Sequence, residues 1–387
     1  MDFSDTREEA EYRAHVRAWL DANAERRKPG QTFQVQYGQD GLVPLAKDWQ
    51  AKKFAGGFAG ITLPREYGGQ GGNQMQQVIY NQEEANYVTP RGVYEIGLGM
   101  CIPTMLAYAT EEQKQRYAPA AQKGEEIWCQ LFSEPVAGSD VAGSKTRAVR
   151  DGDDWIISGT KCWITNAGIS DLYTIFARTS DDRHKGITAF LVEAAWGVEV
   201  EKLEHKLGIK GSPTGVIRMD EVRVPDSARI GEVGQGFAIA MHTLDRSRPT
   251  IGAQAVGVAQ GALDYAVGYM KERRTFGRPL ADNQGLQWMA ADCAMKVEAA
   301  RGLVYKACAI AEEGDPRGDL GMAGAMAKCF ASDVAMQVTT DAVQFLGGYG
   351  YTNEFPVERM MRDAKITQIY EGTNQIQRMV IAKKLLG

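Results

Sequence analysis

The chain has 387 residues, of which 44% are hydrophobic and 24% charged, a balance typical of a folded protein with room for two or three domains. Its formal net charge of -5 excludes a whole-molecule attraction for nucleic acid or anionic lipid, although a local basic pocket could still bind a polyanion. The six cysteines include no Cys-x-x-Cys motif, and the chain has only four histidines. We therefore expect reduced core thiols, without a disulfide framework or a metal site.

The amino-terminal residues predict neither export nor a membrane anchor. They read "MDFSDTREEAEY", which is acidic where a signal peptide is basic and then apolar. The sequence also lacks an apolar run near the roughly 20 residues that a membrane-spanning helix requires. We expect a soluble, cytoplasmic protein.

The first third of the chain has helical periodicity. Thr6 with Glu9, and Thr110 with Gln113, have the spacing of capping boxes and predict helix starts. Between them, the glycines and proline of "PREYGGQGG" (64–72) predict a loop, because they suit neither helix nor strand. We expect an N-terminal all-α domain, residues 1–126.

Short alternating runs replace this pattern from about residue 127. Apolar and polar residues alternate on both sides of an Asp151-Gly152 turn, and β-branched runs continue to about 230. This predicts a central antiparallel β-domain, residues 127–233. The order α, β, α argues against a doubly wound parallel sheet. Neither Gly-x-Gly-x-x-Gly nor a P-loop motif is present, so any nucleotide cofactor must be held in another way.

Long helical periods return after residue 235 and predict a C-terminal helical bundle domain, residues 234–387. Within it we expect helices over roughly 283–313 and 320–346, the second ending at Gly347-Gly348. In the helix before them, small residues recur every four positions at Ala253, Gly257 and Gly261. Such a face either admits another helix closely or fills a crowded core.

A strand-to-loop segment and a later strand carry candidate ligand contacts. In "QLFSEPVAGSDVAG" (130–143), glycines let the main chain approach a ligand, but from spacing alone a plain strand-to-loop corner with Asp140 capping a turn is the better explanation. In "GTKCWITNAG", Trp163 and Thr165 are two apart and share a strand face. An aromatic plate beside a hydroxyl suits a planar heteroaromatic ring, whereas the simpler alternative is a core tryptophan.

The segment "ERRTFGRPL" is strongly basic. We expect Arg273 and Arg274 in the last turn of the preceding helix, with Gly277 as its C-cap. Arginines at that end interact favourably with the helix dipole. Alternatively, they offer a bidentate guanidinium to a phosphate.

A carboxylate next to a glycine marks the segment "QIYEGTNQIQR". If residues 356–370 are helical, Gly372 supplies a left-handed C-cap, and Thr373 or Asn374 caps the next helix. Glu371 then lies on a sharp turn between two rigid elements. A carboxylate in an apolar cleft has a raised pKa and can act as a general base. The alternative is a surface glutamate at a helix end.

Taken together, these motifs resemble those of the acyl-CoA dehydrogenase family of flavoproteins, in order and approximate spacing over nearly the whole chain. The matching stretches are "SEPVAGSDVAG", "KCWITNAG", "LDRSRP", "ERRTFG", "QFLGGYGYTNEFPVERMMRDAKI" and "QIYEGTNQIQR". The resemblance implies α+β architecture: an N-terminal helical domain, a β-domain and a C-terminal four-helix bundle. It also implies FAD between the last two domains and across a subunit interface, in a homotetramer.

The resemblance implies roles for individual residues. The flavin ring would meet Gln130, Phe132, Ser133, Trp163 and Thr165. The pyrophosphate and adenosine of a neighbouring subunit's FAD would meet Arg273, Thr275, Phe276, Gln284, Gln344, Phe345, Gly347 and Gly348. Thr373 and Gln375 would also contact the cofactor. The acyl-CoA would meet Ser139, Leu244, Asp245, Arg248, Tyr370 and Gly372, with Leu98 and Met100 as candidates for the pocket floor.

Glu371 would remove the α-proton while flavin N5 accepts the β-hydride, which gives a trans-2-enoyl-CoA. The resemblance implies that the Glu371 backbone N–H and a flavin hydroxyl stabilise the thioester oxygen. Electrons would pass to an electron-transferring flavoprotein, as in fatty acid β-oxidation. Some members carry the base on an earlier helix, at the position of Ser247 here, which cannot serve. Gln130 stands where the family often has a bulky aromatic.

Two other functions fit the same resemblance. A flavin oxidase, monooxygenase or desulfinase shares the fold, but an intact Glu371 beside Thr373 disfavours that reading. A structural subunit that only completes a neighbour's FAD site commonly lacks the base, whereas this chain has it.

Overall fold

The computed structural model describes residues 5–28 and 41–387. Contacts within the chain divide it into two compact units. One unit takes in Met1–His205 and Lys210–Thr243, and the other takes in Lys206–Ile209 and Leu244–Gly387. In the described ranges, no helix combines the length and apolarity needed to cross a bilayer.

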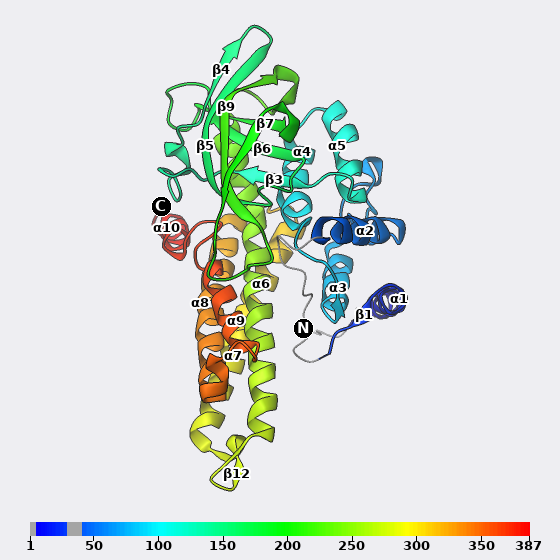
Figure 1. The fold of residues 1–387 in the computed structure, drawn as a ribbon, viewed down its shortest axis with the longest axis vertical. Helices are drawn as coiled ribbons and strands as arrows, with labels where there is room; N and C mark the ends of the chain where they lie inside the picture. Colours follow the sequence, from blue (N-terminus) through cyan, green and yellow to red (C-terminus); the bar gives the residue numbers. More distant parts are fainter. Residues whose placement is uncertain (1–4, 29–40) are drawn as a thin grey trace. The chain divides into compact units, whose positions relative to one another are not determined.

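Helices form the amino-terminal part of the first unit (Figure 1). They are α1 (Arg7–Asn23), α2 (Leu42–Ala55), α3 (Gln74–Glu84), α4 (Ile102–Tyr108) and α5 (Glu111–Lys123). The capping boxes predicted at Thr6 and Thr110 are confirmed. A third box, Asn73 with Gln76, opens α3 and was not predicted. The predicted loop contains one 3-10 turn, Arg65–Tyr67.

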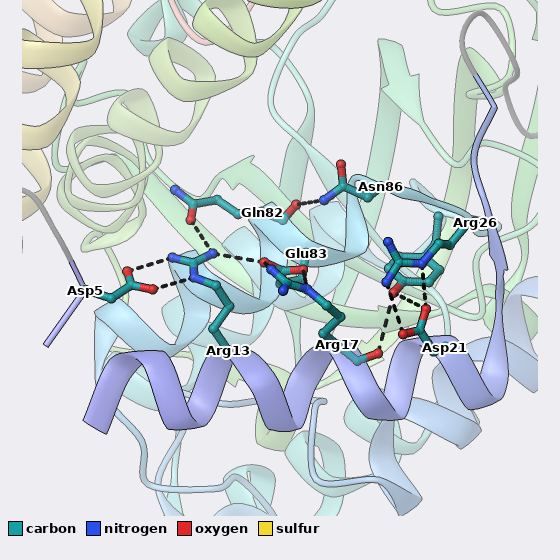
Figure 2. Close-up of polar contacts among 9 residues, drawn as sticks. Asp5, Arg13, Arg17, Asp21, Arg26, Gln82, Glu83 and Asn86 are labelled. Atoms are coloured by element: carbon teal, nitrogen blue, oxygen red, sulfur yellow. Dashed lines mark hydrogen bonds and ion pairs between the residues drawn. The ribbon is translucent and has the colours of Figure 1, made fainter. Parts of the chain in front are cut away.

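Ion pairs join α1 to α3 around one buried carboxylate (Figure 2). Glu83 on α3 accepts hydrogen bonds from Arg17 at 2.9 and 3.0 Å and from Arg13 at 3.2 Å. Burial opposes ionisation of Glu83, but the two guanidinium groups outweigh burial and lower its pKa. At the far end of α1, Asp21 pairs with Arg26, which lies in a short ladder of β1 (Glu25–Arg26) with β2 (Tyr87–Val88).

One sheet follows, with strand order β10-β7-β6-β4-β5-β9-β8 and β3 paired to β6. Its strands are β3 (Trp128–Leu131), β4 (Arg147–Asp151), β5 (Asp154–Thr165), β6 (Leu172–Arg178), β7 (Ile187–Glu193), β8 (Val198–Leu203), β9 (Thr214–Pro225) and β10 (Arg229–Ile230). The predicted Asp151-Gly152 turn joins β4 to β5, with Gly152 at φ 63°. Ile102, Met105 and Ala118 of the helices pack with Phe176 and Ala189 of the sheet in one core.

The sheet differs from the prediction in one respect, because it is mixed rather than purely antiparallel. Trp128–Leu131 pairs parallel with Leu172–Ile175. The β4–β5 hairpin lies between these strands in the chain, and this long connection lets β6 run in the direction of β3. Alternation of apolar residues shows which segments are strands but says nothing about their direction.

The second unit is built of long helices (Figure 1). They are α6 (Gly236–Glu272, whose first turns belong to the first unit), α7 (Gln284–Glu312), α8 (Leu320–Leu346), α9 (Val357–Thr367) and α10 (Asn374–Leu386). The helices expected over 283–313 and 320–346 are confirmed. Small and β-branched residues such as Ala255, Val297, Ala327 and Val334 form the core.

The end of α6 contradicts the prediction. The helix stops at Glu272, and β11 (Arg274–Thr275) pairs with β12 (Arg278–Pro279) in a hairpin. Arg274 is therefore not helical, Arg273 is only the residue after the helix, and Gly277 is not a C-cap. Phe276 and Gly277 have φ of 52° and 80°, and two successive left-handed residues are what a two-residue hairpin turn requires.

The face of small residues on α6 lies open. Ala253 and Gly257 are exposed, which rules out the crowded-core alternative. A Cβ added to Gly257 would meet nothing within 4 Å, and one on Gly261 would come no closer than 3.9 Å, to Met360. Within the described residues, then, no helix uses this face for a close approach.

Candidate active site

Glu371 lies on a turn between α9 and α10. The helix α9 ends at Thr367 rather than at the expected Tyr370, and Gln368 follows in right-handed conformation, so Gly372 is not a C-cap. The chain instead reverses at Glu371 and Gly372, with φ of 52° and 85°. Thr373 is the N-cap of α10, and its hydroxyl accepts from the Ile376 N–H at 3.3 Å.

The backbone conformation of this turn restricts which residues can occupy positions 371 and 372. Gly372 has positive φ, and a Cβ on it would lie 2.7 Å from Nε2 of Gln377. Glu371 has a left-handed backbone that costs a non-glycine residue about 1–2 kcal/mol. Buried Gln377 holds the strained turn in place by donating to the carbonyls of Glu371 and Gly372 at 3.0 and 2.9 Å.

The Glu371 side chain points inward in the second unit. The hydroxyl of Ser247, on α6, donates a hydrogen bond to Glu371 Oε2. Burial raises the pKa of Glu371, and Ser247, Arg248 and Lys328 offset only part of that rise. The surface-glutamate alternative is therefore wrong, and the predicted direction of the pKa shift is confirmed. A carboxyl group in this state binds a proton more readily than a surface glutamate does.

The backbone at Glu371 offers a donor beside the carboxylate. Within the described part of the chain, the Glu371 N–H makes no hydrogen bond. A donor left open next to a candidate base can serve a ligand carbonyl. One residue thus presents both a proton acceptor and a hydrogen-bond donor.

The other candidate substrate residues of this unit lie on α6 and at the turn. Arg248 is 4% exposed and donates to Asp245, and burial lowers its pKa. Its Nε has no hydrogen-bond partner in the described part of the chain, and an orphaned buried donor is a group that a ligand can satisfy. Leu244 is buried, and Tyr370 donates to Gln254. Ser139 is exposed and belongs to the first unit.

The first unit brings together the residues proposed for a flavin ring. The Cys162 N–H donates to the Ser133 carbonyl at 2.9 Å and so ties the segment after β3 to β5. Lys161 donates to the Phe132 carbonyl at 3.0 Å and to Glu134 at 2.8 Å. This buried ion pair fixes the backbone around Phe132 and Ser133.

Trp163 is not a core residue. Its side chain is 63% exposed, its φ is 61°, and it lies where the register between β5 and β9 shifts. A β-bulge re-aims a side chain in this way, and bulges are common beside functional sites. The core alternative is therefore wrong. Ile164, the residue between them in the sequence, is buried, whereas Trp163 is exposed and Thr165 is half-buried. This is expected if Trp163 and Thr165 both face away from the core.

The same unit also has open hydrogen-bond donors that could contact a heteroaromatic ring. Gln130 is 9% exposed, yet its Nε2 has no partner among the described residues. The Ser133 N–H likewise makes no hydrogen bond to the described residues. Two open donors and an exposed aromatic plate suit the carbonyls and face of a flavin.

The remaining residues expected to contact FAD belong to the second unit, where they lie in two separate places. Arg273 lies over the Tyr349 ring at 5.3 Å, which joins the β11–β12 hairpin to the turn Gly347–Tyr351 that follows α8. Fully exposed Phe276 is in this hairpin, and Figure 1 shows β12 at one end of the helices and α10 towards the other. Gln284 opens α7, and Gln344 and Phe345 close α8. Thr373 and Gln375, at the start of α10, are therefore not brought together with the hairpin set.

Some residues of the site were missed from the sequence. Gln377 and Lys328 both contact the Glu371–Gly372 turn. The signal for Lys328 was a lone lysine in the small, apolar run "AGAMAKCFA", where a charge has no evident solvent face.

Family models match the chain in the same order as its segments. They describe an acyl-CoA dehydrogenase N-terminal domain at residues 6–125, a middle domain at 129–222 and a C-terminal domain at 234–386. The chain therefore belongs to the acyl-CoA dehydrogenase family, and the resemblance and fold class expected from the sequence are confirmed. Membership makes the protein an oxidoreductase.

Individual relatives of the chain are also named as acyl-CoA dehydrogenases. "Probable acyl-CoA dehydrogenase fadE25" of Mycobacterium leprae is 51% identical over 334 residues, 86% of this chain and 85% of that protein. The short-chain specific acyl-CoA dehydrogenase of Clostridium acetobutylicum is 42% identical, with 100% of both chains covered. The structure of butyryl-CoA dehydrogenase from Megasphaera elsdenii has a TM-score of 0.84 at 36% identity, with 100% of both chains covered.

Proposed function

We propose that this protein is an FAD-dependent acyl-CoA dehydrogenase in which Glu371 is the catalytic base. The observation that carries the proposal is a carboxyl group with a burial-raised pKa, held on a strained turn by Ser247 and Gln377. Strain of this kind persists where surrounding structure over-determines it, and it concentrates at functional sites. A raised pKa suits a group that must accept a proton near neutral pH.

The α-proton of the acyl-CoA would pass to a Glu371 carboxylate oxygen. As it leaves, negative charge develops on the thioester oxygen, and the open Glu371 N–H is a suitable donor to it. One such donor contributes about 3–4 kcal/mol to stabilisation of the transition state. Ser139, Leu244, Asp245, Arg248, Tyr370 and Gly372 are the residues that we propose contact the substrate.

When bound, FAD would supply a hydride acceptor for the β-carbon, so that the product is a trans-2-enoyl-CoA. Gln130, Phe132, Ser133, Trp163 and Thr165 would hold its ring, with the open donors at Gln130 and Ser133 in support. Arg273, Thr275, Phe276, Gln284, Gln344, Phe345, Gly347 and Gly348 would hold the pyrophosphate and adenosine of a neighbouring subunit's FAD. Thr373 and Gln375 would complete the contacts.

We further propose that the enzyme passes electrons to an electron-transferring flavoprotein and works as a cytoplasmic homotetramer. The family relationship supports the acceptor. A shared FAD site explains why the hairpin set and the start of α10 lie apart in one chain.

Anaerobic reduction of the bound flavin tests the function. A suitable saturated acyl-CoA from a panel of chain lengths and branching patterns should bleach the flavin absorbance of the purified protein. If the whole panel leaves the spectrum unchanged, the dehydrogenase assignment is wrong. Glu371→Gln should retain flavin while its reduction slows by several orders of magnitude, as expected when a positioned base is removed from an otherwise intact site. Near-normal reduction in this variant would place the base elsewhere.

A further inference from the structure

A buried lysine lies against the turn that carries Glu371. Lys328, on α8, is 0% exposed. Its ammonium donates to the Gly372 carbonyl at 2.8 Å and to Asn374 Oδ1 at 3.0 Å. Within the described part of the chain, no carboxylate lies within ion-pair distance of it. Burial of a charge without a paired counter-ion is costly, so this position calls for a specific reason.

Both acceptors of Lys328 belong to the segment just after the base. The carbonyl of Gly372 also accepts from Gln377 at 2.9 Å, so two buried donors converge on it. The amide of Asn374 is oriented in turn, because its Nδ2 donates to Asp333 at 2.8 Å and to Ser332 Oγ at 2.9 Å. This leaves Asn374 Oδ1 facing Lys328, which therefore holds the Gly372 carbonyl on one side of Thr373 and the Asn374 side chain on the other.

The same ammonium acts on the Glu371 carboxyl through space. The pKa of Lys328 is lowered to about 8, mainly by burial; Arg248 also lowers it, whereas Cys329, Glu371 and Asp333 raise it. A pKa near 8 leaves Lys328 mostly protonated at neutral pH. In that form it is one of the positive charges, with Arg248, that counteract the effect of burial on Glu371.

We propose that Lys328 is a positioning residue for the catalytic base, which fixes the Gly372–Asn374 backbone and stabilises the Glu371 carboxylate electrostatically. The inference rests on the proposed function in so far as Glu371 is the base. The clamp and the charge act together: the hydrogen bonds hold the turn, while the positive charge keeps enough of the carboxyl ionised to accept a proton.

The test compares Lys328→Met, which keeps the volume but removes the charge and donors, with Ser332→Ala. The control removes a neutral hydrogen bond to the same Asn374 amide. The pKa of Glu371 is read by infrared titration of its carboxyl, with Glu371→Gln as the spectral blank and no substrate present. We expect Lys328→Met to raise this pKa by about one unit or more, and Ser332→Ala to leave it unchanged.

A second readout is the pH profile of flavin reduction by acyl-CoA. Its acidic limb should move to higher pH in Lys328→Met by the same amount, which a merely structural defect would not produce. An unshifted Glu371 pKa in folded Lys328→Met overturns the proposal. If no acyl-CoA reduces the wild-type flavin, the proposed function fails, but the infrared titration still decides the role of Lys328.

If Lys328→Met does not fold, the coupling can be measured from the other side. Electrostatic coupling between two groups is reciprocal, so Glu371→Gln should lower the pKa of Lys328. The ¹⁵N chemical shift of labelled lysine side chains follows this titration. An unchanged Lys328 pKa in that variant contradicts the proposal.

Discussion

At the scale of single residues, Glu371 combines two unfavourable features. Its backbone is left-handed, and partial burial raises the pKa of its carboxyl. Either feature destabilises the fold, and a residue chosen for stability alone would have neither. Ser247 reduces the second cost by donating to the carboxylate. Serine at this position therefore assists the proposed base rather than replacing it.

Gly372→Ala tests how tightly the turn is built. The new methyl group would meet Gln377 Nε2 at 2.7 Å, on a backbone with φ of 85°. We expect a loss of about 1–3 kcal/mol in unfolding free energy, together with slower flavin reduction, because Gln377 must move and release the Glu371 carbonyl. Chemical denaturation and stopped-flow reduction measure the two effects.

Gly257→Ala is the matched control for that substitution. The position is helical and exposed, and a Cβ there meets nothing within 4 Å. Alanine should raise the unfolding free energy by about 0.5–1 kcal/mol and leave flavin reduction unchanged. If Gly372→Ala behaves like this control, the turn does not need glycine.

At the scale of elements, sequence predicts best where the signal is local. The boxes at Thr6 and Thr110 place two helix starts correctly because both partners lie within one turn. The end of α6 was misplaced because Gly277 fits a helix C-cap as well as a hairpin turn. The bulge at Trp163 was missed because it depends on the register with β9, which a single strand does not encode.

The buried pair Lys161–Glu134 tests the support of the proposed flavin loop. Glu134 also accepts from the Thr146 N–H at 3.0 Å, and both charges are almost fully buried. Burial opposes ionisation of Glu134, but Lys161 and the backbone donors outweigh it and lower its pKa. Lys161→Met leaves this carboxylate without its counter-ion, so we expect a loss of about 3–5 kcal/mol in unfolding free energy.

A double variant supplies the control for that prediction. Lys161→Met combined with Glu134→Gln removes both charges, so it should recover much of the stability lost in the single variant. FAD affinity, measured by fluorescence titration, should remain weakened in both variants, because neither restores the donor to the Phe132 carbonyl. Equal stability of Lys161→Met and wild type would show that the pair does not hold this loop.

At the scale of the whole molecule, the sequence predicts the family and the order of its segments but not the surroundings of the proposed base, Glu371. Glu371 was found from its neighbours in the chain. Its hydrogen-bond donor Ser247 lies 124 positions away, and Lys328 is 44 positions from Gly372. Contacts of that separation depend on helix packing, for which a single sequence carries no direct signal. Burial has the same origin, which is why the sequence predicts a raised pKa for Glu371 only on the condition that its carboxylate lies in an apolar cleft.

The stability of the whole fold in acid should depend in part on the contact between α1 and α3, where Glu83 accepts hydrogen bonds from two arginines (Figure 2). In the folded state, the guanidinium groups of Arg17 and Arg13 lower the pKa of Glu83 from its ordinary value of 4.5. A lowered pKa adds stability that is fully present above the unfolded pKa and is lost as pH falls through the folded pKa. Glu83→Gln should therefore reduce the unfolding free energy at pH 7 by about 1–3 kcal/mol, because the charge-assisted hydrogen bonds from Arg13 and Arg17 are lost.

The difference between wild type and Glu83→Gln should shrink as the pH falls from about 4.5 through the lower folded-state pKa, because the wild-type carboxyl then becomes neutral, as the glutamine amide is at every pH. Thermal unfolding between pH 7 and pH 3 measures this. Glu11→Gln is the control, since its pair with Arg7 is exposed and such pairs contribute little. A Glu83→Gln difference that stays constant with pH would mean that packing around residue 83, rather than its charge, joins α1 to α3.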